Sequence, residues 1–306
     1  MTTKTLSRRH ILFSTAALAT LVACRQATGD SSLLGGDSGE GGDSGPDGDT
    51  AAGEDTGLGG DTGTGEDTGS GEDTGGSGGD EHPDTIDATA WATGGTAAMT
   101  AAASYPNPFD GVTLGECAQI SSTTEGPCTT TTTKVRQDIS EGWDGLPVRL
   151  VFKIVDDGCS PLAGKQVKIW HTNYAGSYSG ETPNAGMCLT DRDYSSQNFG
   201  RGAQVTDAEG IVQFDTCFPG WYSSRAVHIH IQVEDSQVSQ VFFPASVTKG
   251  VFNNHKVYKG FGQPDTSFDR DTVIGSFSDA QRALLIMDVR QMSDGAMLAS
   301  KALAVR

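Results

Sequence analysis

Two histidines that alternate along one short segment could hold a metal ion. One residue separates His228 from His230. In an extended strand successive side chains point to opposite faces, so both imidazoles share one face. Tyr222 and Arg225 lie a few residues upstream, and a phenol beside two imidazoles suits ferric iron better than zinc, which takes Cys, His and carboxylate ligands. The plainer interpretation is a half-buried strand whose two histidines are only hydrogen-bonded.

Several segments of the chain resemble, in the same order, the intradiol ring-cleavage dioxygenases, the group of the catechol and protocatechuate 3,4-dioxygenases. The resemblance covers roughly residues 115–300 and is carried by spaced motifs. These motifs are TTEGP (123–127), VRQDISEG (135–142), VKIWHTNYAGSYSG (167–180), FGRGAQVTDAEGIVQF (199–214) and PGWYSSRAVHIHIQV (219–233). The last of them is similar to the iron-binding segment of that family.

The resemblance implies a non-haem Fe(III) centre with two tyrosine and two histidine ligands. The matching positions hold Tyr178, Tyr222, His228 and His230, with Tyr222 and His230 as the axial pair. Tyr174 is the competing candidate for the first tyrosine. The family usually has a small or acidic residue at its position, so we expect Tyr178 to be the ligand.

The resemblance also implies the reaction and two further site residues. A small aromatic diol would bind the ferric ion through both oxygens and displace Tyr222, which would carry off a substrate proton. Insertion of O2 between the two hydroxylated carbons would then give a muconate-type diacid. Arg225 matches the family's arginine that stabilises ring charge, and Gln240 matches a glutamine near the same pocket. For both residues the alternative is a polar side chain at the surface or at a sheet edge.

Two other functions fit parts of the pattern. One is an exported β-sandwich binding module whose iron site is vestigial, although drift would be expected to remove at least one of the four ligands. The other is a zinc hydrolase that uses His228 and His230, but the motif offers no neighbouring Asp or Glu. We therefore favour the ring-cleaving dioxygenase.

Four polar residues near these motifs are expected to lie outside the chemistry. His171 follows Trp170 and has no metal role in the family pattern, and His255 is expected to be a solvated loop residue. Arg201 and Asp207 are expected to brace the Arg-Gly turn and the Thr-Asp-x-x-Gly turn.

Residues 1–24 resemble a bacterial lipoprotein signal of the twin-arginine type. Arg8 and Arg9 precede an apolar run over residues 11–23, which is shorter than a membrane span of about 20 residues. Leu-Val-Ala before Cys24 resembles a lipobox. We expect Cys24 to be lipidated and to anchor an exported protein in the cell envelope, at the outer membrane or cell surface. The alternative is an ordinary secretory signal.

Residues 25–94 are expected to form a disordered acidic linker. The stretch from Asp30 to Asp87 holds 17 of the 39 acidic residues of the chain and no Lys or Arg. Low apolar content with high net charge cannot compensate for the entropy of ordering. Such acidity repels nucleic acid. Repeated Gly-Glu-Asp-Thr-Gly units leave calcium binding as an alternative.

Residues 95–306 are expected to form one all-β domain, an antiparallel β-sandwich. Apolar or alternating runs such as 146–156 and 166–172 are separated by Gly, Pro, Asn and Asp. A short helix is expected within residues 278–290, with Ser278 or Asp279 as its N-cap.

The cysteines indicate an oxidising compartment. With Cys24 lipidated, five cysteines remain, so at most two disulfides form and one thiol is left. We favour a short local bridge between Cys117 and Cys128. Cys217 lies just before the segment of Tyr222, His228 and His230. One interpretation of Cys217 is a buried, small apolar side chain without a chemical role.

Overall fold

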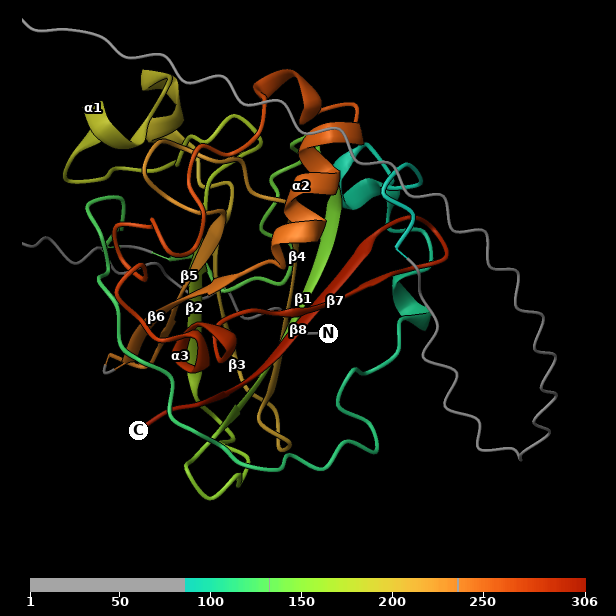
Figure 1. The fold of residues 1–306 in the computed structure, drawn as a ribbon, viewed down its shortest axis with the longest axis vertical. Coiled ribbons are helices and arrows are strands. Elements are labelled where there is room, and N and C mark those ends of the chain that lie inside the picture. The colour runs from blue at the N-terminus through green and yellow to red at the C-terminus, as the bar shows by residue number, and fades with distance from the viewer. Residues whose placement is uncertain (1–85, 132, 236) are drawn as a thin grey trace, which may run out of the picture. The chain divides into compact units, whose positions relative to one another are not determined.

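The computed structural model describes residues 86–131, 133–235 and 237–306 (Figure 1). The signal, Cys24 and most of the acidic linker therefore lie outside the described residues. Residues 86–94, which we assigned to the linker, pack onto the domain. Trp91 is buried in the core, and Ala92 N donates to the carbonyl of Gly295 at 2.8 Å. The packed chain thus begins before the expected boundary at residue 95.

In the part of the chain that the structure describes, eight strands form two four-stranded sheets, which confirms the all-β sandwich. The first sheet has the order β4-β1-β8-β7, and the second has the order β3-β2-β5-β6. The strands are β1 Pro147–Val155, β2 Gln166–Trp170, β3 Arg201–Val205, β4 Ile211–Cys217, β5 His228–Val233, β6 Gln237–Phe242, β7 Asp288–Gln291 and β8 Met297–Ala304. The pairs of named strands are antiparallel except β1 with β8, which is parallel. The sequence did not predict that parallel pair.

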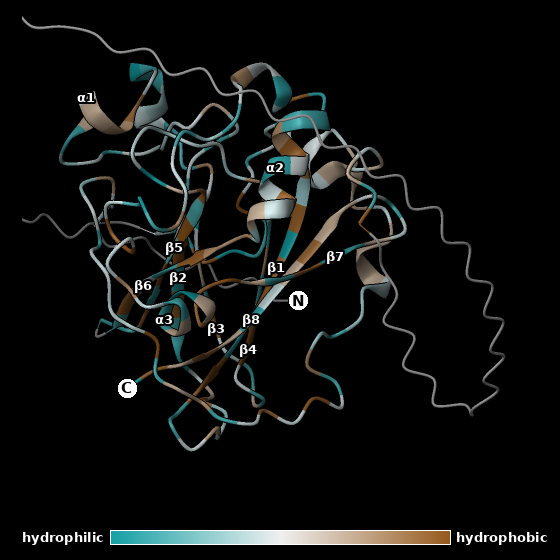
Figure 2. Ribbon diagram, in the orientation of Figure 1, coloured by the Kyte–Doolittle hydropathy of each residue, from teal (hydrophilic) through white to brown (hydrophobic). Residues whose placement is uncertain are grey.

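The core lies between the two sheets. Side chains that do not point into this core point outward from the sandwich. Leu150 and Phe152 of β1 pack in one cluster with Ile169 of β2 and with Ile229 and Ile231 of β5, and hydrophobic residues recur along these strands (Figure 2). Each such side chain contributes about 1.5–3 kcal/mol on burial. Because side chains alternate along β5, His228 and His230 project from the opposite face, away from this core.

Helices lie before the first strand and between later strands. The α-helices are α1 Ala185–Cys188, α2 Ala245–Asn254 and α3 Asp279–Ala283, and the 3-10 helices are η1 Gly95–Ala98, η2 Ala102–Ser104, η3 Arg192–Ser196 and η4 Lys259–Phe261. Ser278 caps α3 with a capping box, as predicted. Helix α2 was not predicted from the sequence, because Gly250 and several β-branched residues lower its helix propensity. Its buried face consists of Val247, Val251 and Phe252. None of the helices in the described part of the chain is long and apolar enough to cross a membrane.

Among the described residues two disulfides join distant loops, and the expected local bridge is wrong. Cys117 pairs with Cys159 and Cys128 pairs with Cys188, whereas Cys217 is a buried free thiol. Cys128 lies on the outer face of the second sheet, where the fold brings α1 beside it. Closing loops with separations of 42 and 60 residues stabilises the folded state by roughly 4 kcal/mol each in the chain-entropy account.

The expectation for His255 is also wrong. Its side chain is buried, and its ring packs against Tyr258 with a centroid distance of 5.0 Å. Its Nδ1 accepts a hydrogen bond from Val257 N, so its Nε2 carries the proton and donates to the carbonyl of Ala92 at 2.8 Å. This partner could not be predicted from the sequence, because Ala92 belongs to the segment that we expected to be a disordered linker.

Candidate metal centre

Two loops that pack backbone against backbone carry the tyrosines of the site. Tyr178 lies in the loop after β2, and Tyr222 lies in the loop between β4 and β5. Gly176 has a φ of +78°, and a Cβ there would lie 2.2 Å from the carbonyl oxygen of Trp221. A Cβ on Gly220 would lie 2.4 Å from the carbonyl oxygen of Tyr174. Glycine at both positions lets the two loops meet, which brings the two phenols together.

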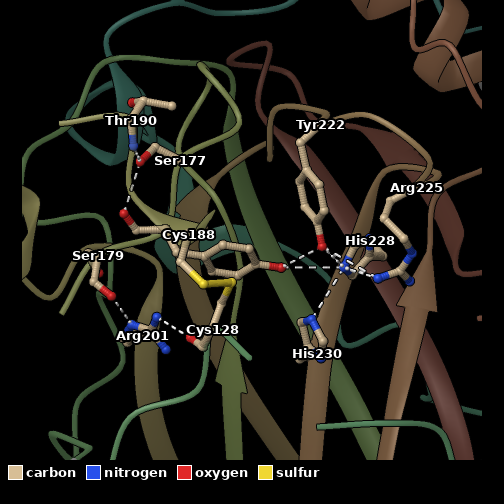
Figure 3. The surroundings of a disulfide bond; sticks show 11 residues. Cys128, Ser177, Ser179, Cys188, Thr190, Arg201, Tyr222, Arg225, His228 and His230 are labelled. Atoms are coloured by element: carbon tan, nitrogen blue, oxygen red, sulfur yellow. Dashed lines mark hydrogen bonds between the residues drawn. A yellow bond between two sulfur atoms is a disulfide. The ribbon is translucent and has the colours of Figure 1, made fainter. Parts of the chain in front are cut away.

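The four residues predicted as ligands converge on one point on the outer face of the second sheet. Figure 3 shows Tyr222, His228 and His230 pointing toward one another. The Tyr178 Oη atom lies 3.3 Å from Tyr222 Oη and 3.4 Å from His228 Nε2. His228 Nε2 is also 3.2 Å from Tyr222 Oη and 3.3 Å from His230 Nε2. Ligand atoms that surround one ion at about 2 Å lie about 3.3 Å from each other in a tetrahedral arrangement. The spacing therefore fits a single metal ion.

Hydrogen bonding alone does not account for this crowding. His228 Nδ1 lies 2.7 Å from the carbonyl oxygen of Ala226 and donates to it, so Nε2 presents a lone pair. Four polar atoms, from Tyr178, Tyr222, Arg225 and His230, lie within 3.4 Å of that one nitrogen. A single ring nitrogen with one lone pair cannot serve them all. A cation at the centre of the cluster would use all four ligand atoms.

Burial sets the protonation states of these side chains. It lowers the pKa of His228 to about 3 and that of His230 well below the ordinary value, so both imidazoles are neutral. Burial also raises the pKa of Tyr222, and raises that of Tyr178 well above its ordinary value. Neutral imidazoles are ready to coordinate a metal, and a cation would favour the phenolate form of both tyrosines.

The types of ligand atom separate the candidate metals. In the part of the chain that the structure describes, no group of three or more His, Cys, Asp and Glu side chains could hold a metal ion. The site therefore lacks the two-histidine, one-carboxylate set of ferrous oxygenases and the set of a zinc hydrolase. Two phenols with two imidazoles fit a hard trivalent ion such as Fe(III).

Arg225 and Gln240, both predicted from the resemblance, are buried beside the ligands and bonded to each other. Arg225 Nη2 donates to Gln240 Oε1, and Arg225 Nη1 lies 3.4 Å from Tyr222 Oη. Gln240 Nε2 donates to the carbonyl of Thr124 at 3.3 Å. Neither residue is a polar group at the surface, because Arg225 is 8% exposed and Gln240 is 0% exposed. Gln240 does lie at a sheet edge, since β6 is the last strand of the second sheet.

Asp271 holds Arg225 in place, and the sequence analysis missed it. Its carboxylate accepts from Arg225 Nε at 3.0 and 3.2 Å and from the backbone N–H groups of Ala226, Val273 and Ile274. It lies in a loop 46 residues after Arg225, and no pattern in that loop indicates the contact. The only available signal was an Asp in a segment without regular structure.

Two large side chains support the ligands from the side. Trp170 stacks on His230 with a centroid distance of 4.7 Å and an interplanar angle of 10°. The guanidinium of Arg201 lies 5.8 Å from the ring centroid of Tyr178 and donates to the carbonyls of Ser179 and Cys128. Arg201 thus braces the loops of Ser179 and Cys128 and not the Arg-Gly turn expected of it. Burial lowers its pKa to about 10, so it remains a cation that favours the phenolate of Tyr178.

Tyr174, the competing candidate for a ligand, makes contacts elsewhere, and so do His171 and Asp207. The ring of Tyr174 packs against Trp143 at 5.5 Å and Phe261 at 5.8 Å. His171 is buried with Nδ1 2.8 Å from the carbonyl of Thr172 and Nε2 2.9 Å from Thr216 Oγ1, so it links the two sheets. Asp207 accepts from backbone N–H groups of its own turn, as expected.

A cavity of about 500 Å³ reaches the cluster and is lined by Tyr178, Tyr222, Arg225 and His230 among others. Another hollow, of about 540 Å³, lies between α2 and residues 263–269 and contains none of the four ligands. Only the first can bring a substrate to the ligand atoms. Its volume lies within the range of about 300–1,000 Å³ that is typical of small-molecule sites.

Comparisons with known proteins bear on the family of the chain. The family model described as Dioxygenase matches residues 123–298. An intradiol ring-cleavage dioxygenase from Tetranychus urticae is 26% identical with a TM-score of 0.54, over 62% of this chain and 95% of that chain. A catechol 1,2-dioxygenase from Pseudomonas arvilla is 20% identical with a TM-score of 0.40, over 60% of each chain. No curated protein matches the chain. The family match spans more than half of the sequence, and the chain therefore belongs to the dioxygenase family, in its intradiol ring-cleavage group.

Proposed function

We propose that this protein is an Fe(III) dioxygenase that cleaves a catechol-type ring between its two hydroxylated carbons. The observation that carries the proposal is the convergence of Tyr178, Tyr222, His228 and His230 at 3.2–3.4 Å. Ferric iron held there would supply a Lewis acid and a template for both oxygens of the diol. Family membership supports catechol-type aromatic compounds and O2 as the reactants.

Tyr222 is placed to take up a substrate proton. A catechol that binds through both oxygens must lose its hydroxyl protons, and the Tyr222 side chain lines the cavity beside the other ligands. Burial raises the pKa of Tyr222, so its phenolate accepts a proton readily. Arg225 Nη1, 3.4 Å from Tyr222 Oη, stabilises the phenolate before that transfer.

Arg225 and Gln240 supply fixed dipoles and charge at the reacting ring. The guanidinium is held by Asp271 and Gln240 on two sides, so its Nη1 edge faces the cavity beside Tyr222. A cation that is already oriented stabilises negative charge on the ring without reorganisation during the reaction. We propose Arg225 and Tyr222 as catalytic residues and Gln240 as a residue that orients Arg225.

The function is tested with simple catechol in air. The purified protein loaded with ferric iron should absorb visible light through phenolate-to-iron charge transfer. It should consume one O2 per ring and give the muconate-type diacid with both atoms of isotopically labelled O2 in the product. A coloured aldehyde acid would contradict cleavage between the hydroxylated carbons. Catechol binding without O2 uptake would point to the vestigial binding module, and a protein that stays colourless after loading would refute the iron site.

We also propose that the protein is exported and anchored in the cell envelope through a lipid on Cys24. The support is the Arg8-Arg9 pair, the short apolar run and the Leu-Val-Ala-Cys sequence that ends at Cys24. Two disulfides in the domain are in keeping with an oxidising compartment. A folded precursor would suit the twin-arginine route, because a metal loaded in the cytoplasm is kept only if the protein crosses already folded.

Cys24→Ser should move the protein from the membrane fraction to the soluble fraction, because it removes the thiol that carries the lipid. Fractionation with immunodetection measures this shift, and the ring-cleaving activity of the released protein serves as the control for folding. Salt washes distinguish a lipid anchor from electrostatic attachment. A wild-type protein that is soluble and whose mature N-terminus is not Cys24 would refute the anchor.

A further inference from the structure

The wall of the cavity that reaches the ligand atoms is almost uncharged. Among the described residues that line it, the ionisable side chains are Arg225, His230 and the two ligand tyrosines. The rest of the wall is formed by small hydroxyl-bearing residues and by apolar groups. These apolar groups are Pro127, Ala175, Met187, Val273 and the Cys128–Cys188 disulfide. Lys, Asp and Glu do not occur among these lining residues.

Arg225 is the cation of this wall, and its contacts fix the direction in which it points. Its Nε donates to both oxygens of Asp271, whose side chain is 0% exposed, and its Nη2 donates to Gln240. Its Nη1 faces the ligand cluster, 3.4 Å from Tyr222 Oη. A carboxylate on a substituent that points away from the ligand atoms would therefore meet no cation among the described residues of this wall. Burying such a carboxylate without a partner is more unfavourable than burying a neutral polar group.

The cavity has room for a substituent as well as for the diol ring. Its volume is about 500 Å³, which is in the range of pockets that enclose drug-sized ligands. Tyr178 and His230 at its base are 2% and 3% exposed, whereas Met187 on α1 is 75% exposed and marks the mouth. A substituent that points away from the ligand atoms would thus pass the disulfide and reach Met187.

We propose that this cavity selects catechols that carry an uncharged, apolar substituent, and that Met187 is a specificity-determining residue at its mouth. The proposal rests on the proposed function and narrows its substrate class. Flexible Met side chains suit apolar ligands of varied shape. The Cys128–Cys188 disulfide ties α1, which carries Met187, to the loop of Cys128. This link holds the two sides of the mouth together.

Two catechols of similar size test the selectivity: 4-isopropylcatechol and 3,4-dihydroxybenzoate differ mainly in charge. Binding is measured without O2 from the change in visible absorption, and cleavage is measured from O2 uptake. The wild-type protein should favour 4-isopropylcatechol by roughly 10- to 100-fold in both Kd and kcat/KM, because the carboxylate lacks a partner. Met187→Lys should narrow that ratio by about fivefold, which is the value of an exposed ion pair.

Val112→Lys is the matched control, because Val112 is an exposed apolar residue, 50% exposed, that does not line the cavity. It adds the same charge and should leave the ratio unchanged. Equal or tighter binding of 3,4-dihydroxybenzoate by the wild type would overturn the proposed selectivity while the ring-cleaving function stands. Equal effects of Met187→Lys and Val112→Lys would overturn the role of Met187. Failure to bind or cleave either catechol would instead refute the proposed function, and this inference with it.

Discussion

Tyr178→Phe is expected to shift the visible absorption of the ferric protein and to weaken iron binding by more than about 100-fold. Removal of a residue that only orients a ligand lowers metal affinity by roughly 10- to 100-fold, so loss of a ligand should cost more. Tyr178 Oη lies 3.3–3.4 Å from the other ligand atoms, and the side chain is 2% exposed, so water has poor access to replace it. Iron content and the absorption spectrum are the two measurements.

Tyr174→Phe is the matched control, because it removes the same hydroxyl four residues earlier. The ring of Tyr174 packs against Trp143 and Phe261 instead of the ligand cluster. Iron content and spectrum should therefore match those of the wild type. The reverse pattern, an intact spectrum in Tyr178→Phe and a changed one in Tyr174→Phe, would reverse the ligand assignment.

The local part of the site could be predicted from the sequence because a strand has a period of two. The alternation of His228 and His230 with Ile229 and Ile231 places two imidazoles on one face and two apolar residues in the core. Tyr222 follows from its position in the same short segment. Tyr178 is separated from His228 by 50 residues, and only the resemblance to a family linked the two.

Contacts between distant segments could not be predicted in this way. Asp271 belongs to a loop without a repeating pattern, and its partner Arg225 is fixed only once β5 and that loop lie side by side. The same reason explains the wrong disulfide, since sequence separation favoured Cys117 with Cys128 while the fold brings Cys188 to Cys128. The parallel pairing of β1 with β8 also depends on how the last strand returns to the first sheet.

Loss of Arg225 should slow the chemical step without removing the metal. Arg225→Ala is expected to lower kcat by about 100- to 1,000-fold, which is typical when a fixed group that stabilises developing charge is removed. Arg225 is not among the four ligands, so iron content and the change in colour on anaerobic addition of catechol should persist. Steady-state O2 uptake and anaerobic spectra separate these two effects. Loss of iron in Arg225→Ala would mean that the residue supports the metal site and not the reaction.

Asp271→Asn tests whether the carboxylate acts through Arg225. Asp271 accepts from Arg225 Nε and from three backbone N–H groups, and an amide cannot replace all these acceptor bonds. The free energy of unfolding should fall by about 3–5 kcal/mol, because a buried ion pair loses one partner. In addition, kcat should fall because the guanidinium is no longer fixed.

In the Arg225→Ala background the same Asp271→Asn substitution should change kcat by less than about twofold, since the effects of residues that act as a unit are not additive. Equal losses of kcat in both backgrounds would show that Asp271 contributes to the reaction independently of Arg225.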